Sequence, residues 1–144
     1  MNFGKNRIQY NNFVWQYYRL SKVDIYFYQN GEALAQEAVT VAQKKLPELA
    51  YFFQYDLQQR IIVLVYNKLT DFRQSNIGLV SGNLQYNIGG VTQIIGNKIF
   101  IYYDGNRQHF EAEITKSLAQ VFINEMVYGT DFKTRLANST LIAF

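Results

Sequence analysis

The hydrophobic pattern is most regular between Phe110 and Gly129, where apolar side chains recur every three or four residues and predict a long helix. One stripe of this helix is apolar throughout: Phe110, Ile114, Leu118, Val121 and Phe122. A second stripe is also largely apolar: Ala112, Lys116, Gln120, Ile123 and Val127. Since two apolar faces are typical of a buried helix, we expect this one to lie between layers of the fold.

Upstream of that helix, aromatic and β-branched residues predict strands at 13–19, 23–28, 61–66, 91–95 and 98–103. Within the second strand, Val23, Ile25 and Phe27 share one side. Asp24 lies on the other side with Tyr26 and Tyr28, and we expect it at the surface. The run 61–66 is apolar without alternation, which is typical of a central strand.

A second helix is predicted from Glu32, with small residues leading its buried stripe: Ala35, Ala38, Ala42, Leu46, Leu49 and Phe53. Pro47 is expected to kink or interrupt it, because proline removes a backbone donor. Gly96 and Asn97 form a two-residue turn that predicts a hairpin. A short helical turn is expected at Thr70 and Asp71.

The order β-β-α-β-β-β-α predicts an α+β fold, a single mixed β-sheet with packed helices. We find no internal repeat and no linker, so the 144 residues are interpreted as one domain, 1–144. Apolar residues make up 49% of the chain and charged residues 17%, a balance that indicates a globular protein. No apolar run approaches the roughly 20 residues of a membrane span, so no transmembrane helix is expected.

Composition also limits the chemistry. The chain has no Cys and one His, which excludes thiolate catalysis and any site that needs two histidines from one chain. The net charge of +3 comes from scattered basic residues, so a nucleic-acid partner is not expected. The chain is rich in aromatic residues, with twelve Tyr and eleven Phe, and we interpret most of these rings as packing groups of the strands. The alternative is a carbohydrate- or cell-wall-binding module that uses exposed Tyr and Trp15.

Five stretches carry a family resemblance in this order: FGKNRIQY, FVWQYYRLSKVDIYFY, GEALAQEA, IIVLVYNKLTDFRQSN and GGVTQIIGNKIFIYYDG. They resemble the zincin-like (gluzincin, peptidase MA-like) domain of bacterial exported proteins, in which a signal peptide precedes the domain and a TolB-type β-propeller follows it. The resemblance implies a zincin-like N-terminal subdomain and a periplasmic or extracellular location. The first twelve residues lack the apolar stretch of a signal peptide.

Active members of that family carry His-Glu-x-x-His on the helix that matches 110–129, because two imidazoles one turn apart hold zinc and the Glu activates its water. The resemblance places Lys116 and Gln120 at the two ligand positions and Ser117 at the general base, within Lys116-Ser117-Leu118-Ala119-Gln120. A lysine ammonium has no free lone pair, and serine supplies no carboxylate. We therefore expect no zinc, no other cofactor and no peptidase activity, and the third-ligand helix is expected beyond the chain's end.

Several side chains near this motif have other expected roles. Lys116 is expected to be buried, in place of the metal's charge, bonded to Gln120 or paired with Glu113. A Ser-Lys dyad of Lys116 and Ser117 is not expected, because neighbours on a helix diverge by about 100°. Acidic residues on the helix are interpreted as a solvated edge: Glu111, Glu113 and Glu125. His109 is interpreted as an exposed loop or cap residue.

The expected function is that of an inactive pseudo-metallopeptidase, a protein- or peptide-binding scaffold module in the bacterial cell envelope, with a downstream β-propeller implied by the resemblance. A residual non-metal hydrolase is the further alternative. In zincins, extended peptides pair with the edge strand before the active helix. The matching residues here are Lys98, Ile99, Phe100, Ile101, Tyr102 and Tyr103. The glycine-rich loop 78–90 is interpreted as a loop beside this site, and not as a phosphate-binding loop.

Overall fold

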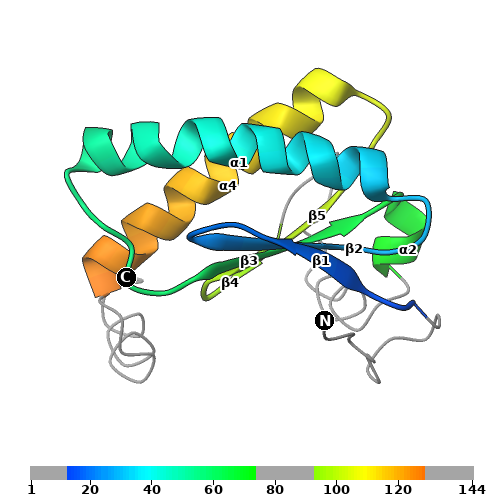
Figure 1. Ribbon diagram of the computed structural model, residues 1–144, viewed down its shortest axis with the longest axis horizontal. Coiled ribbons are helices and arrows are strands. Elements are labelled where there is room, and N and C mark those ends of the chain that lie inside the picture. Colours follow the sequence, from blue (N-terminus) through cyan, green and yellow to red (C-terminus); the bar gives the residue numbers. More distant parts are fainter. Residues whose placement is uncertain (1–12, 74–92, 129–144) are drawn as a thin grey trace.

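The structure is a computed structural model that describes residues 13–73 and 93–128, and it confirms the α+β fold with a single mixed sheet (Figure 1). The elements in chain order are β1 (Gln16–Arg19), β2 (Val23–Phe27), α1 (Glu32–Phe53), β3 (Ile61–Tyr66), α2 (Leu69–Arg73), β4 (Gln93–Ile95), β5 (Lys98–Tyr102) and α4 (Arg107–Tyr128). The predicted arm 1–12, the loop 78–90, a helix expected at 131–137 and the apolar tail 141–144 lie outside the described residues.

The five strands are arranged in the order β1-β2-β3-β5-β4. β2, β3 and β5 run parallel to one another, and the strands at both ends, β1 and β4, pair antiparallel with their neighbours. The prediction that 61–66 forms the central strand is therefore confirmed. The predicted hairpin is also present: β4 and β5 flank Gly96, whose φ of 64° suits the first central position of a two-residue turn.

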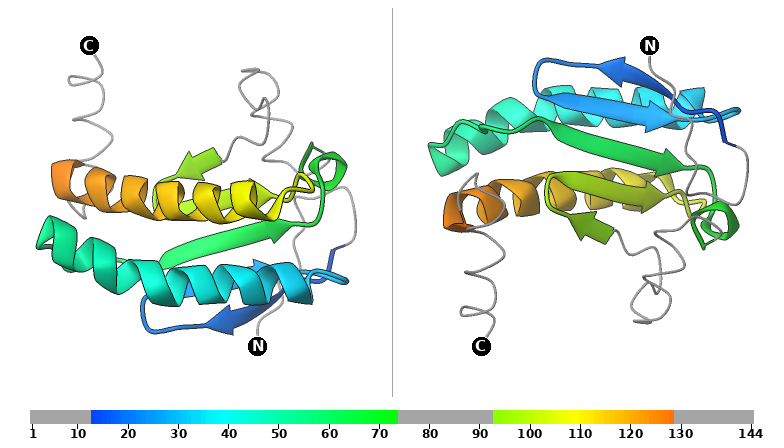
Figure 2. Two further views of the ribbon diagram at one scale, coloured as in Figure 1. Left: turned by 90° about the horizontal axis from the view of Figure 1, so that it is seen from above. Right: turned by 90° about the horizontal axis from the view of Figure 1, so that it is seen from below.

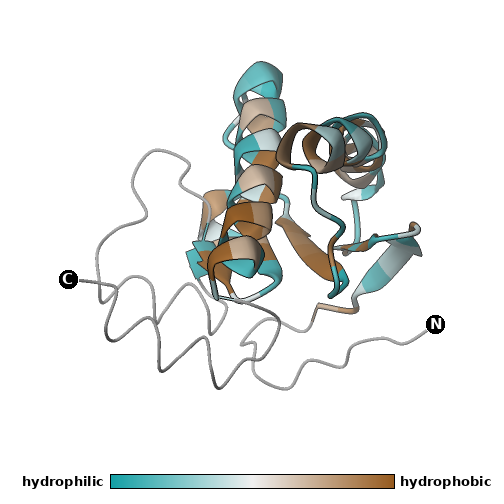
Figure 3. Ribbon diagram, turned by 90° about the vertical axis from the view of Figure 1, so that its left-hand side faces the viewer, coloured by the Kyte–Doolittle hydropathy of each residue, from teal (hydrophilic) through white to brown (hydrophobic). Residues whose placement is uncertain are grey.

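The two faces of the sheet follow the alternation of the strands. α1 and α4 lie side by side on one face (Figure 2). Beneath them is the main core, to which β2 contributes Val23, Ile25 and Phe27, as predicted. The apolar colouring gathers where the helices meet the sheet (Figure 3). On the other face, aromatic rings form a second cluster: Trp15, Tyr28, Tyr66, Phe72, Phe100 and Tyr102.

The turn between β2 and α1 depends on a glycine. The N–H of Gly31 donates to the carbonyl of Tyr28 at 2.8 Å. A Cβ at position 31 would lie 2.7 Å from Oδ1 of Asn67 and 2.9 Å from that carbonyl oxygen. Only a residue without a side chain therefore fits between the end of β2 and the residue that follows β3.

α1 runs through Pro47 without a break, so the predicted interruption is wrong. Proline removes the bond to the carbonyl of Gln43, but both residues are exposed, and water can satisfy that carbonyl. The fully buried residues of α1 all lie in its first half: Ala35, Ala38, Val41 and Ala42. The second half packs on the core only partly.

α4 buries one of its two predicted stripes. Phe110, Ile114 and Leu118 are at most 2% exposed, with Val121 and Phe122 beside them in the core. The second stripe faces outward, and its members Ile123 and Val127 are 39% and 55% exposed. The expectation that α4 lies between two layers is thus wrong, since this helix has one sheet beneath it and α1 at its side.

Candidate functional site

The residues at the three zincin positions of α4 do not converge. The side chain of Lys116 is 77% exposed, and its Nζ lies 3.6 Å from Oε2 of Glu113. Nε2 of Gln120 donates to Oδ1 of Asn124 at 2.9 Å, one turn further on. Ser117 is buried, and its hydroxyl donates to the carbonyl of Glu113 at 2.7 Å. The pairing of Lys116 with Glu113 is present, but the expected burial of Lys116 is wrong, because the stripe that carries it faces solvent.

His109 lies in the first turn of α4, between two carboxylates. Its Nδ1 is 2.6 Å from Oδ2 of Asp104, and its Nε2 is 3.6 Å from Oε2 of Glu113. Asn106 caps the helix, accepting the N–H of His109 at 2.9 Å. Partial burial of Asp104 works against ionisation, but the N–H of Asn106 and the ring of His109 outweigh it and lower the pKa of Asp104. The histidine thus orders the helix start.

Glu125, one of the three acidic residues predicted at a solvated edge of the helix, is buried instead. It is 6% exposed and accepts the hydroxyl of Tyr55 at 2.9 Å and the backbone N–H of Gln58 at 2.5 Å. A third, longer bond of 3.4 Å comes from the N–H of Gln59. The carboxylate therefore ties the end of α4 to the segment that leaves α1. The prediction failed because these partners lie more than 60 residues away in the chain.

Glu113 contacts His109 and Lys116 within α4, whereas Glu111 takes part in a contact between helices. Glu111 is exposed, as predicted, and lies beside Glu37 of α1. Burial of Glu37 and the nearby carboxyl group of Glu111 raise the pKa of Glu37, while Arg107, whose Nε lies 2.8 Å from Oε1 of Glu37, acts in the opposite direction. This group holds α1 and α4 together near the start of α4.

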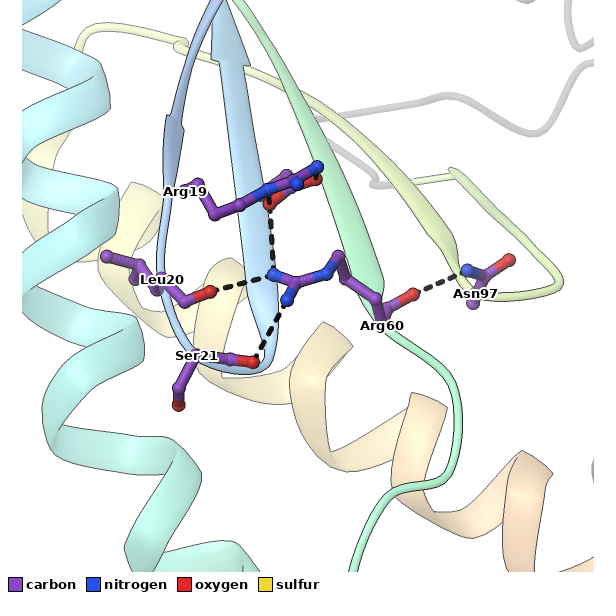
Figure 4. A network of polar contacts seen from close by, with 6 residues as sticks. Arg19, Leu20, Ser21, Arg60 and Asn97 are labelled. Atoms are coloured by element: carbon purple, nitrogen blue, oxygen red, sulfur yellow. Dashed lines mark hydrogen bonds and ion pairs between the residues drawn. The ribbon is translucent and has the colours of Figure 1, made fainter.

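Asp24 is buried, not at the surface as the sequence predicted. It is 2% exposed, and two guanidinium groups surround its carboxylate (Figure 4). Nε and Nη2 of Arg19 donate to its two oxygens at 2.9 and 2.8 Å, and Nη1 of Arg60 donates to Oδ1 at 3.1 Å. Arg60 also donates to the carbonyls of Leu20 and Ser21. The network fastens the β1–β2 turn to the start of β3.

The predicted peptide-binding strand, β5, is not at the edge of the sheet. β3 pairs with it on one side, from Ile62 opposite Lys98 to Tyr66 opposite Tyr102. β4 covers Lys98 to Phe100 on its other side. Tyr103 follows the strand, and its N–H donates to the carbonyl of Tyr66 at 3.1 Å. The identification of 98–103 as the edge is therefore wrong for Lys98 to Phe100, because the antiparallel hairpin places β4 outside this part of β5.

β4 is the last strand of the sheet on that side, and in the described ranges 13–73 and 93–128 its outer side pairs with no strand. Ile95 and Lys98 flank the two-residue turn and form a hydrogen-bonded pair. Hydrogen-bonded and non-hydrogen-bonded pairs alternate along an antiparallel ladder, so the next pair, Ile94 with Ile99, has backbone groups that point away from the partner strand. Ile94 therefore directs both its N–H and its carbonyl outward. Its neighbour Ile95 is 45% exposed.

Trp15 does not support a carbohydrate-binding face. It is 2% exposed and packs edge-on against the rings of Tyr28 and Tyr66. In the part of the chain that the structure describes, the most exposed aromatic side chains are Tyr51 and Phe52, at 79% and 75%. They lie at the end of α1, and Trp15 is not available to join them.

The described residues contain no candidate metal site and no candidate membrane-spanning helix. Across residues 13–73 and 93–128, no group of three His, Asp or Glu side chains is arranged so that it could hold a metal ion. Neither of the long helices described combines the length and apolar character needed to cross a membrane. No protein-family model, curated protein or solved structure matches the chain.

Proposed function

We propose that this chain is a non-catalytic module that binds an extended peptide or protein segment by adding it as a strand beside β4. The observation that carries the proposal is the outward-facing backbone of Ile94 in a short antiparallel edge strand. A sheet edge of this kind offers main-chain hydrogen bonds to an incoming strand. The other edge strand, β1, pairs with β2 on one side, and its Arg19 side chain bonds to Asp24 of β2.

The non-catalytic part of the proposal rests on the residues of α4. Lys116, Ser117 and Gln120 are the wrong types for the zinc ligands and base of the zincin-like family, and their side chains hydrogen-bond or ion-pair within α4 itself. The proposed setting, the bacterial cell envelope with a neighbouring β-propeller, rests on the resemblance to that family alone. The proposed partner is accordingly an exported protein or peptide.

The test compares two variants at the residue that would bond the incoming strand. A peptide that binds the wild-type protein is first selected from a displayed library of extended sequences, and its affinity is then measured for each variant. Ile94→Pro deletes the outward N–H and leaves the bonds between β4 and β5 intact, since proline is tolerated where an edge N–H faces solvent. Ile94→Val is the matched control, because it keeps the N–H.

We expect Ile94→Pro to weaken binding about tenfold or more, because one main-chain bond is lost and the ring obstructs the added strand. Ile94→Val should bind like the wild type, and the amide signals perturbed by the peptide should be those of β4. Equal affinities of the three proteins, or perturbations confined to another surface, would contradict strand addition. Cleavage of the peptide after Zn²⁺ is added would contradict the non-catalytic assignment.

A further inference from the structure

A groove of about 590 Å³ opens between the C-terminal half of α1 and the turn that joins β1 to β2. Its origin is a mismatch of lengths. α1 has 22 residues and spans about 33 Å, whereas the five residues of β2 span about 17 Å. The helix therefore extends past the strands that it covers (Figure 1). Since α1 fully buries only residues up to Ala42, the space under its last turns is not filled by the core.

The floor of this groove is apolar, and it is continuous with the main core. Its apolar lining comes from two helices and two connecting segments, and it includes Leu20, Leu46, Ala50, Leu57 and Phe122. Phe122 and Leu57 are 1% and 4% exposed, so they form a fixed base, while Leu46 and Ala50 pack only partly against the core. A hydrocarbon chain laid on this floor would complete the packing.

The rim of the groove carries excess positive charge. Nζ of Lys22 donates a hydrogen bond to the carbonyl of Leu57 at 3.1 Å. It also lies 4.0 Å from the carboxylate Oδ1 of Asp56, whose side chain is 81% exposed. Arg19, at the same rim, shares the single carboxylate of Asp24 with Arg60. The guanidinium groups of Arg19 and Arg60 thus share one negative charge (Figure 4). The Lys22 ammonium has three donors, so it keeps donors for a ligand.

We propose that this groove binds an aliphatic carboxylate, with its hydrocarbon chain on the apolar floor and its carboxylate at Lys22 and Arg19. The volume lies within the range of small-molecule sites, and an apolar lining with a few charged groups is their usual composition. A carboxylate at the rim would gain charge-assisted hydrogen bonds. The groove borders β1 and β2, at the opposite end of the strand order from β4, so this inference does not depend on the proposed function.

The test uses the full 144-residue chain and decanoate, titrated by calorimetry and followed by amide chemical shifts. Decyltrimethylammonium, with the same chain length and the opposite charge, is the control ligand. Lys22→Gln removes the rim charge, whereas Lys45→Gln removes an exposed charge of α1 that pairs with Glu48 and does not line the groove. Ala50→Leu fills the floor. Thermal melts of each variant establish that it is folded.

We expect saturable binding of decanoate, and a severalfold weaker affinity for octanoate, since each methylene that enters an apolar site contributes up to about fourfold. Lys22→Gln should weaken binding at least fivefold and Ala50→Leu should abolish it, while Lys45→Gln should leave it unchanged. The proposal is overturned if decanoate does not saturate at millimolar concentration, if the alkylammonium binds equally well, or if the folded Ala50→Leu protein binds decanoate like the wild type.

Discussion

The buried carboxylate of Asp24 provides the sharpest test of how this fold is held together. Asp24→Ala would remove the acceptor of three hydrogen bonds and leave two guanidinium groups, those of Arg19 and Arg60, without their shared counter-charge. The substitution adds no steric bulk, and β2 keeps all of its backbone pairing with β1 and β3. The measured change in the free energy of unfolding therefore reports mainly on the charge network.

The size of the expected loss of stability follows from how deeply the Asp24 carboxylate and the two guanidinium groups are buried. Removing one member of a fully buried ion pair typically costs 3–5 kcal/mol, roughly, because the partner is left charged and dry. Here the side chain of Asp24 is 3% exposed, but those of Arg19 and Arg60 are 58% and 36% exposed and regain water once freed. We accordingly expect a loss of about 2–3 kcal/mol for Asp24→Ala, and a smaller loss for Asp24→Asn, which keeps one acceptor oxygen.

Urea denaturation at neutral pH, followed by circular dichroism, measures these differences. Asp56→Ala is the matched control, because this aspartate is 81% exposed and lies 4.0 Å from Lys22, in an ion pair of the kind that contributes little. Its effect should stay below about 0.5 kcal/mol. If Asp24→Ala destabilised the protein no more than Asp56→Ala does, the reasoning that burial makes this network important would be refuted.

Three further predictions concern other contacts. Glu125→Gln should lower stability by about 1–2 kcal/mol in urea melts, since the buried donors would lose their charged acceptor. Gly31→Ala should cost about 1–3 kcal/mol in the same assay, because the new methyl group would lie 2.9 Å from the backbone carbonyl oxygen of Tyr28; a neutral result would contradict the tight turn. The pKa of Asp104 is lowered on folding, so its contribution to stability is present above about pH 4 and is lost as the pH falls through the lowered value. His109→Ala should move the Asp104 titration in carboxyl NMR spectra to higher pH, and an unmoved titration would exclude this pairing as a cause.

The alternation of residues was sufficient to predict most of the architecture. Val23, Ile25 and Phe27 face the helices as expected, and the continuous apolar run of β3 is central. Both signals are local, since burial of a face imposes a period of two and burial of both faces removes it.

The same alternation failed for polar residues whose partners are distant in the chain. Asp24 falls on the aromatic side of β2, where a carboxylate alone would be expected in water. Arg60, which makes its burial possible, is 36 residues away. Glu125 likewise depends on backbone N–H groups at 58 and 59. Arg19 lies only five residues from Asp24, but Arg60 and the partners of Glu125 come from distant segments that meet only in the folded protein.

The position of the sheet edge, on which the proposed function depends, did leave a signal in the sequence. β5 is apolar on both of its faces, and Ile99 to Tyr102 are all buried, which is the mark of an interior strand that the run in β3 also carries. β4 has Gln93 and the exposed Ile95 on the face away from the helices. A hairpin fixes which two strands are neighbours but not which of them lies outside. The parallel pairing of β5 with β3 decides that question, and it places the open backbone at Ile94, where a partner strand should be sought.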